Sequence, residues 1–330
     1  MDIDAYSTAH RAEWDELARL AAKRPLGGAD ADALIEHYQA GATQLSAIRT
    51  SVGESAQGDR LSLSLSRARL RFTGAGRNIA SVIPRFVGVQ LPAALYQLRW
   101  LTLAIAVASA IIALLYGLWA ANTPGVLAHV GSQAEQSAYV KEFVDYYFNY
   151  ASSSFAGKVW TNNALITAES IAFGIVGFYS PYVLFSNAQG IGLDAAVLGT
   201  QGHLDTFFLY IAPHGQLELY SVFTGGAAGM LIFWAWIAPG ARTRTQALAE
   251  QGRALFTVAI GLIGSLLVSG IIEGFVTKQP WPWPIKIGIG TVALGAFLFY
   301  QWGLGRRAHR AGETGDLEEF EAGARQLVAG

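Results

Sequence analysis

The sequence predicts an all-α membrane protein with about six transmembrane helices and further amphipathic helices at the membrane surface. Of its 330 residues, 52% are hydrophobic and only 14% are charged, whereas a soluble domain carries about 25% charged residues. Residues 101–121 contain no charge, and a helix of that length crosses the roughly 30 Å hydrocarbon core of a bilayer. The net charge of −1 argues against a nucleic-acid partner.

The amino-terminal region has no long apolar run. Acidic residues close to Met1 argue against a signal peptide. Apolar residues at helical spacing predict helices over residues 8–23 and 31–51, which a Pro-Leu-Gly-Gly break separates. We expect residues 1–58 to form a cytosolic helical hairpin.

Residues 59–100 mix basic and apolar positions. The basic positions are all arginine: Arg60, Arg67, Arg69, Arg71, Arg77, Arg85 and Arg99. Basic amphipathic segments bind the anionic surface of a membrane, and this segment runs directly into the first span. We therefore expect it to lie on the membrane surface. The alternative is a soluble helix with a solvated arginine face.

Six segments are candidates for crossing the bilayer: residues 101–121, 164–185, 193–212, 217–238, 254–276 and 285–304. They define a transmembrane domain over residues 101–304, which a cytosolic tail follows at 305–330. The third segment is expected to be irregular, because its polar residues need shelter from lipid. These residues are Asp194, Gln201, His203 and Asp205.

The distribution of basic residues decides whether the third segment crosses. Lysine and arginine are absent from residues 159–241, and Arg242, Arg244 and Arg253 follow. Segments rich in these residues stay in the cytoplasm, so the amino-terminal region, the 242–253 loop and the tail belong on that side. An even number of crossings must precede Arg242, which predicts six spans with both termini in the cytoplasm.

The segment between the first two spans is then external. Residues 134–150 have an amphipathic helical pattern that is rich in aromatic residues, namely Tyr139, Phe143, Tyr146, Tyr147, Phe148 and Tyr150. Tyrosine rings prefer the interfacial layer of a membrane, so we expect a helix that lies flat on the outer face. This helix either anchors the protein or forms a platform for an extracytoplasmic partner.

Ionisable residues lie in or at the ends of the predicted spans: Glu169, Asp194, His203, Asp205, His214, Glu218 and Glu273. A central charge in a bilayer costs at least about 2.5–3.5 kcal/mol. No lysine or arginine accompanies the residues between 159 and 241. These carboxyl groups must therefore be protonated, hydrogen-bonded, hydrated or bound to a cation.

The sharpest local pattern is Pro213-His214-Gly215-Gln216-Leu217-Glu218. Pro213 suits the first turn of a helix, and His214 and Glu218 share one helical face. Such a pair can cap and hydrogen-bond within the fold, carry protons or cations, or bind a metal. A metal ligand role for His214 and Glu218 holds only if a metal is bound.

Two small-residue patterns predict tight helix packing, Gly225 with Gly229 and Gly270 with Gly274. The zinc-protease pattern His-Glu-x-x-His and the hydrolase pattern Gly-x-Ser-x-Gly are absent from the sequence. Asn162 shares a helical face with Glu169. It either caps a helix or lines the same polar pocket as Glu218.

These residues carry a resemblance to a known family. The ordered motifs around Asn162-Asn163, Asn187 to Gly190 and Pro213 to Glu218 resemble the stage II sporulation protein M family (DUF95) over roughly residues 101–304. The Asn187-Ala188-Gln189-Gly190 turn departs from the more usual adjacent Asn-Gly. The resemblance implies that the signature positions are Asn162, Asn163, Glu169, Asn187, Gly190, His214, Gly215 and Glu218.

The amino-terminal region resembles the longer form of the family found in high-GC bacteria. The resemblance implies a bacterial plasma-membrane protein with no cofactor. In endospore formers, family members anchor two peptidoglycan hydrolases at the septum, and relatives elsewhere often neighbour genes for MoxR-type ATPases. The expected partners are membrane lipid, extracytoplasmic envelope proteins such as peptidoglycan hydrolases, a cytosolic ATPase and a second copy of the chain.

Three functions are consistent with the sequence. The first is a membrane scaffold of a cell-envelope complex, linked to peptidoglycan remodelling or to sporulation-like differentiation. The second is a transporter or channel for a small solute, proton or cation that uses the intramembrane acidic residues. The third is an intramembrane metal-dependent hydrolase.

Overall fold

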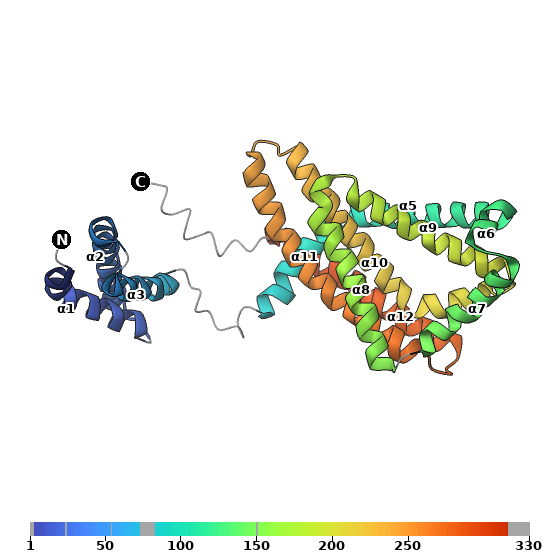
Figure 1. The fold of residues 1–330 in the computed structure, drawn as a ribbon, viewed down its shortest axis with the longest axis horizontal. Helices are drawn as coiled ribbons and strands as arrows, with labels where there is room; N and C mark the ends of the chain where they lie inside the picture. Colours follow the sequence, from blue (N-terminus) through green and yellow to red (C-terminus); the bar gives the residue numbers. More distant parts are fainter. Residues whose placement is uncertain (1–2, 24, 54, 73–82, 150, 316–330) are drawn as a thin grey trace. The chain divides into compact units, whose positions relative to one another are not determined.

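The computed structural model describes residues 3–23, 25–53, 55–72, 83–149 and 151–315, and these ranges are all-α (Figure 1). The chain divides into an amino-terminal unit, Met1–Val82 with Glu318–Gly330, and a large unit, Ile83–Leu317. Arg77, Tyr150 and the part of the predicted tail beyond residue 315 lie outside the described residues. The prediction of an all-α membrane protein is confirmed.

The amino-terminal unit consists of α1 (Ile3–Ala22), α2 (Gly28–Val52) and α3 (Ala56–Phe72). Its core consists of apolar residues from all three helices: Leu17, Leu20, Ala21, Leu34, Ile48, Leu61, Leu65 and Ala68. The indole nitrogen of Trp14 donates to Gln44 Oε1 at 2.6 Å, which ties α1 to α2. Lys23 pairs with Asp30 at 2.6 Å across the turn between these helices.

For residues 59–72, the structure differs from the expected membrane-surface segment. These residues belong to α3, and its leucines at 61 and 65 are buried against α1 and α2. The apolar face of α3 is therefore used inside the unit, and Arg60, Arg67 and Arg69 are exposed on the other side. The exposed side also carries Leu63 and Leu70, each 54% exposed, and α3 joins α1 and α2 in a bundle of three helices instead of a hairpin.

The large unit begins with a π-helical turn, η1 (Phe86–Gln90), and the long helix α5 (Leu91–Asn122). The helices that follow are α6 (Pro124–Val130), α7 (Gln133–Phe148), α8 (Ser152–Ala172) with the 3₁₀ turn η2 (Phe173–Val176), α9 (Tyr179–Thr200), α10 (Leu204–Ile237), α11 (Arg244–Ile272) with the π-turn η3 (Glu273–Thr277), α12 (Trp283–Leu298) with the π-turn η4 (Phe299–Leu304), and α13 (Gly305–Arg310).

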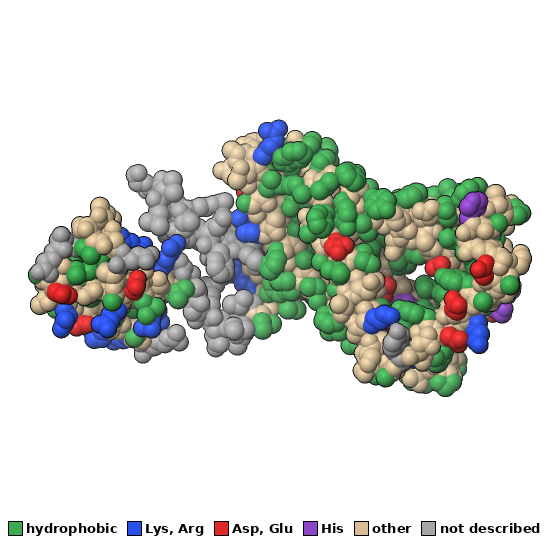
Figure 2. Space-filling model, viewed as in Figure 1, with side chains coloured by type: hydrophobic (Ala, Val, Ile, Leu, Met, Phe, Trp, Pro, Cys, Tyr) green, Lys and Arg blue, Asp and Glu red, His purple; other side chains and the backbone are tan. Residues whose placement is uncertain are grey.

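Four stretches of the described chain are long and apolar enough to cross a membrane: Ile83–Asn122, Leu204–Ile237, Arg244–Thr277 and Trp283–Arg310. Their outward faces carry large apolar side chains such as Leu114, Trp234, Phe256 and Val292, which are more than half exposed. Figure 2 shows hydrophobic side chains over much of the visible surface of this unit. A surface of this kind is buried by lipid, not by water.

The two middle spans predicted from the sequence, residues 164–185 and 193–212, do not form continuous helices. Gly177 adopts a φ of +79° between η2 and α9, and Gly202 a φ of +82° between α9 and α10. A glycine with positive φ ends a helix at low cost, so each predicted span straddles a turn. Pro213 consequently lies ten residues inside α10 and not in its first turn.

Helix α8 packs tightly between α10 and α11. A Cβ atom on Gly225 would lie 2.5 Å from Thr167 Cγ2, and one on Gly229 would overlap the carbonyl oxygen of Ser170. On the other side, Cβ atoms on Gly270 and Gly274 would lie 3.0 Å from Ala156 O and 2.6 Å from Ser152 O. Gly229, Gly270 and Gly274 thus let the backbone of α8 approach, and Gly225 leaves room for the Thr167 side chain, as small residues do between membrane helices.

The helices of the large unit alternate in direction, so their connections gather at two ends (Figure 1). We call the end that contains α7 and the turn between α9 and α10 the α7 end. There Ser137 of α7 donates to Gln201 at 2.9 Å, and Lys278 lies 4.8 Å from the Phe155 ring centre. The turn at Gly177 lies beside Phe233, at the far end of α10. The first turns of α5 meet the segment after α13, where Gln97 donates to the Thr314 carbonyl at 2.6 Å.

Replacement of Gly229 tests the packing of α8. We expect Gly229→Ala to lower the free energy of unfolding in detergent by about 1–3 kcal/mol, because the new methyl group overpacks a backbone contact. The matched control is Gly264→Ala on exposed α11 surface, where a Cβ atom meets nothing within 4 Å. Equal melting temperatures for the two variants would contradict the packing described above.

Candidate functional site

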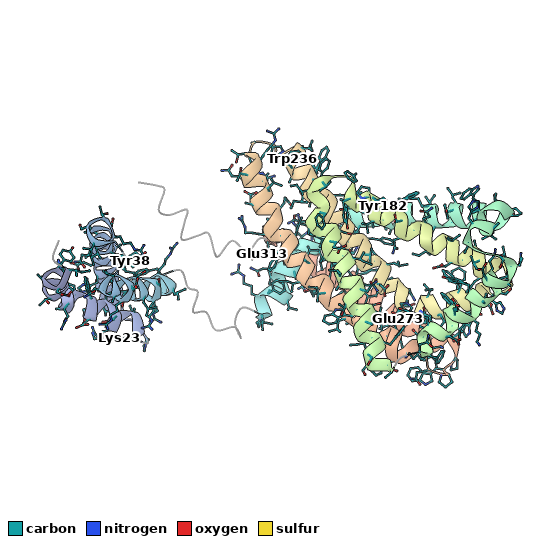
Figure 3. All side chains as sticks on the ribbon, in the orientation of Figure 1. Lys23, Tyr38, Tyr182, Trp236, Glu273 and Glu313 are labelled. Carbon is teal, nitrogen blue, oxygen red and sulfur yellow. The ribbon has the colours of Figure 1, made fainter. Side chains whose placement is uncertain are left out.

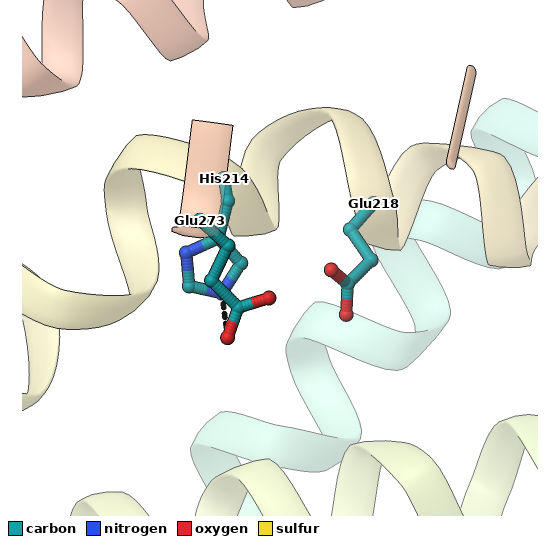
Figure 4. A group of neighbouring side chains, drawn as sticks. All are labelled: His214, Glu218 and Glu273. Atoms are coloured by element: carbon teal, nitrogen blue, oxygen red, sulfur yellow. Dashed lines mark ion pairs between the residues drawn. The ribbon is translucent and has the colours of Figure 1, made fainter. Parts of the chain in front are cut away.

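Three ionisable side chains converge inside the large unit. His214 and Glu218 come from α10, Glu273 is the first residue of η3, and their ligating atoms lie within 4.8 Å of one another (Figure 4). His214 Nε2 is 3.7 Å from Glu273 Oε1. His214 and Glu273 are each 4% exposed. We call these residues the His-Glu-Glu cluster.

Local helix geometry explains the convergence. His214 and Glu218 are one turn apart on α10 and therefore share a face, as their spacing predicts. Glu273 stands where α11 widens from an α-helix into a π-turn. Such π-turns inside membrane or soluble helices are frequent at functional sites.

Polar neighbours hold two members of the cluster. Ser269 of α11 lies 3.1 Å from the His214 carbonyl oxygen and 3.3 Å from Glu218 Oε2, and it can donate to either. The side chain of Asn163, from α8, also hydrogen-bonds Glu218. By contrast, Glu273 Oε2 is buried and has no hydrogen-bond partner.

The cluster lies at the base of a cavity of about 910 Å³ at the α7 end. Helices α7, α8 and α10 and the turn η3 line this cavity. Its charged lining residues are Glu142, Asp145, Lys158, His214, Glu218 and Glu273. Carboxylates thus outnumber the ammonium group of Lys158 in the described lining. Figure 3 shows Glu273 toward this end of the unit, and Figure 2 shows acidic side chains gathered there.

Helix α7 forms one wall of this cavity. The sequence pattern predicts only a helix that lies flat on the outer face of the membrane. Tyr147 is buried against Phe155 and Tyr210, and its ring centre is 6.3 Å from that of His214. Tyr139 donates to Asp194 of α9 at 2.8 Å, and burial raises the pKa of the Tyr139 phenol, so it stays protonated.

The described lining of the cavity ends at the cluster, and neither Ser221 nor Ser265 belongs to it. Beyond Glu218 on α10 and Ser269 on α11, the hydroxyl groups of Ser221 and Ser265 are hydrogen-bonded at 2.9 Å. The neighbouring Leu262 and Val222 are buried in the main core. The cavity therefore opens toward the α7 end and ends at the His-Glu-Glu cluster.

A buried lysine braces the segment after Glu273. Lys286 Nζ donates to the carbonyl oxygens of Thr277 at 2.9 Å and Gln279 at 3.0 Å. A cation at the end of a helical turn satisfies carbonyl groups that have no partner within the helix. Lys286 thereby fixes the end of η3, which carries Glu273.

Of the predicted site residues on α8, Asn162 and Asn163 line the cavity and Glu169 does not. Asn162 lines the cavity and is exposed, but α8 starts at Ser152, so neither Asn162 nor Asn163 caps it. Glu169 lies near the opposite end of α8 and accepts from the Tyr179 hydroxyl at 3.3 Å, so it does not share the pocket of Glu218.

The predicted signature residues of α9 are also remote from the cluster. Asn187 Oδ1 is buried without a hydrogen-bond partner, and a Cβ atom on Gly190 would meet nothing within 4 Å. Gly215 follows His214 directly, where a Cβ atom would lie 2.9 Å from Ile211 Cγ2. The small residue thus keeps this face of α10 free for its neighbours.

The sequence interpretation did not include Glu273 in the site. From the sequence, Glu273 is only an intramembrane acid between Gly270 and Gly274. Those two glycines let η3 pack against the start of α8, and their spacing is the sequence feature that could have indicated a role for Glu273. Tyr147, Ser269, Thr277 and Lys286 gave no signal, because their roles depend on contacts between distant segments.

Comparisons with known proteins agree with the motifs. A domain of unknown function, DUF8413, matches residues 4–74, which cover α1 to α3. No curated protein and no solved structure matches the chain. The family model of stage II sporulation protein M matches residues 103–278, a range that covers more than half of the chain and includes all three members of the cluster. The chain therefore belongs to the stage II sporulation protein M family.

Proposed function

We propose that this membrane protein binds a small cationic ligand in the cavity at the α7 end, which faces the outside of the cytoplasmic membrane. One observation carries the proposal: His214, Glu218 and Glu273 converge at the base of an acid-lined cavity that is closed beyond them. Of the three functions that are consistent with the sequence, this one corresponds to the transporter or channel.

Burial of the His-Glu-Glu cluster has a free-energy cost that supports this proposal. Burying two carboxyl groups beside an imidazole costs free energy unless their charges are compensated. A purely structural core would be at least as stable with apolar residues of similar volume. Proteins retain buried ionisable groups that do not add stability mainly at functional sites. A bound cation would compensate the cluster, so the geometry favours a ligand-binding role over a scaffold alone.

The proposal includes six membrane crossings, by α5, α8, α9, α10, α11 and α12. Helices α8 and α9 are 21 and 22 residues long, which is enough for about 30 Å. Helix α8 packs on α10 and α11, and α9 packs on α5, where Gly192 approaches the Ala113 carbonyl. Neighbouring spans thus shelter the polar residues of α8 and α9 from lipid.

The basic residues support the orientation. Arginines at 242, 244, 306, 307 and 310 lie at ends of α10 to α13 that point away from α7. The α7 end carries lysines at 141, 158, 278 and 286 and no arginine among its described residues. The positive-inside rule then assigns both termini to the cytoplasm and the cavity to the outer side of a bacterial plasma membrane.

The closed base of the cavity favours a binding site that is open to one side over an open channel. A transporter of this kind would need a second conformation in which the contact between Ser221 and Ser265 opens. A hydrolase would need a metal or another activated nucleophile at the same place. Both depend on the same first step, which is binding at the cluster.

Cysteine labelling tests the orientation and the charge of the cavity. The chain contains no cysteine, so Asn162→Cys in the cavity and Ala138→Cys on the exposed face of α7 give single reactive thiols. We expect both to react with membrane-impermeant reagents on intact cells. We also expect the ratio of cationic to anionic reagent rates to be on the order of tenfold higher at residue 162, because the acidic cavity concentrates cations.

Two results would contradict this proposal. One is labelling at residue 138 only after the cells are permeabilised, while Ala241→Cys in the α10–α11 turn reacts on intact cells. The other is the same rate ratio at residues 162 and 138. Asp145→Asn in the Asn162→Cys background should lower the ratio, which checks that the carboxylates are its cause.

A second candidate function is the scaffold of an envelope complex. Its supporting observation is the separate amino-terminal unit, a compact three-helix module with its own family match. The exposed aromatic residues Tyr146 and Phe148 give α7 an apolar outer surface as well. These two regions would bind a cytosolic ATPase and an extracytoplasmic peptidoglycan hydrolase, respectively.

Quantitative co-purification from native membranes tests the scaffold. We expect deletion of residues 3–72, or the double change Tyr146→Ala and Phe148→Ala, to remove specific partners from the detergent-solubilised complex. Glu218→Gln should keep them, because a scaffold does not need the cluster. Identical partner sets for all four proteins, wild type included, would contradict the scaffold function.

A further inference from the structure

We propose that the His-Glu-Glu cluster is a site for a divalent transition metal such as Zn²⁺, bound by His214 Nε2 and by the carboxylates of Glu218 and Glu273. This inference rests on the proposed function, because it names the cation that the cavity receives. It assigns to Glu273 a role that the sequence motifs do not indicate.

The donor geometry is close to that of a metal site. Zinc binds histidine nitrogen and carboxylate oxygen at about 2.0–2.2 Å, which puts tetrahedral ligands about 3.3–3.6 Å apart. His214 Nε2 and Glu273 Oε1 are 3.7 Å apart, and all three ligating atoms lie within 4.8 Å. A side-chain shift of about 1 Å would complete this geometry without any movement of α10 or η3.

An unpartnered buried oxygen atom is a second observation that points to a ligand. Glu273 Oε2 is buried and has no hydrogen-bond partner, although the side chain is 4% exposed. Buried polar atoms nearly always have a partner, and an exception calls for a bound ion or water. In Figure 4 the Glu273 carboxyl group lies between His214 and Glu218, where a shared ion would sit.

The donor types select the class of metal. Calcium and magnesium take oxygen ligands almost exclusively, whereas an imidazole nitrogen favours zinc and its transition-metal neighbours. Three protein ligands leave a fourth position free. Since His214, Glu218 and Glu273 all line the cavity, water or a ligand group in the cavity could occupy it.

The surrounding residues are those that orient metal ligands. Thr277 Oγ1 lies 3.5 Å from His214 Nδ1, which leaves Nε2 to face the two carboxyl groups. Ser269 and Asn163 hold Glu218 in the same way. Outer partners of this kind fix the ring tautomer and the carboxylate orientation. Two carboxylates and one divalent cation also form a neutral group, which lowers the cost of burial.

Zinc binding by the full-length protein tests the inference. The protein is purified in detergent, stripped with a chelator, equilibrated with Zn²⁺ and separated from free metal before elemental analysis. We expect one zinc per chain, with an affinity measured by competition with a chromophoric chelator. His214→Ala, Glu218→Gln and Glu273→Gln should each weaken binding on the order of 100-fold.

Two controls keep the test specific. Glu169→Gln removes a carboxylate of α8 that does not line the cavity and that accepts from the Tyr179 hydroxyl, and we expect it to bind zinc like the wild type. Zinc should raise the melting temperature of the wild type and of Glu169→Gln, but not that of Glu273→Gln. Since Glu273→Gln keeps the side-chain shape, it separates loss of a ligand from loss of the fold.

The outcomes separate this inference from the proposed function. Zinc binding that is absent, or equally strong in wild type and Glu273→Gln, overturns the metal site. If the cavity thiol at residue 162 still prefers cationic reagents in that case, the cation-binding cavity stands and only its metal is wrong. If that preference is also missing, both proposals fail.

Discussion

The close packing of α8 against α10 and α11 is the constraint on which the large unit depends. Gly225 and Gly229 let α8 approach α10, and Gly270 and Gly274 let it approach α11 and η3. A side chain at Gly229, Gly270 or Gly274 would crowd a backbone carbonyl oxygen of α8. The polar residues of α8 would then lose their partners on both neighbouring helices. In a bilayer, water cannot replace those partners.

This packing also explains where the polar chemistry lies. Asn163 reaches Glu218 because α8 contacts α10 at this depth, and Glu273 reaches His214 because the π-turn η3 widens α11 at the α7 end. Helix α7 then closes one side of the cavity with Tyr147. The site is therefore built from segments distant in sequence, and the contacts of one central helix bring most of them together.

The sequence was sufficient for the features that local periodicity controls. The spans around α5, α10, α11 and α12, the helical character of α7, and the shared face of His214 and Glu218 follow from composition and spacing. The ends of α8 and α9 did not, because glycines with positive φ end helices inside apolar runs. The membership of Glu273 in the cluster, and of α3 in the amino-terminal bundle, depends on tertiary packing. The periodicity within a single segment does not predict contacts between distant segments.

A disulfide between α8 and α10 would test the central packing most directly. The chain has no cysteine, and a Cβ atom on Gly225 would lie 3.6 Å from Thr167 Cβ, within the range that a disulfide requires. Oxidation of Thr167→Cys with Gly225→Cys in native membranes should protect both thiols from a maleimide polymer that is added after denaturation, until a reductant is added. Leu165→Cys with Gly225→Cys should stay reactive, because Leu165 is 58% exposed. Equal reactivity of the two pairs would contradict the position of α8 between α10 and α11.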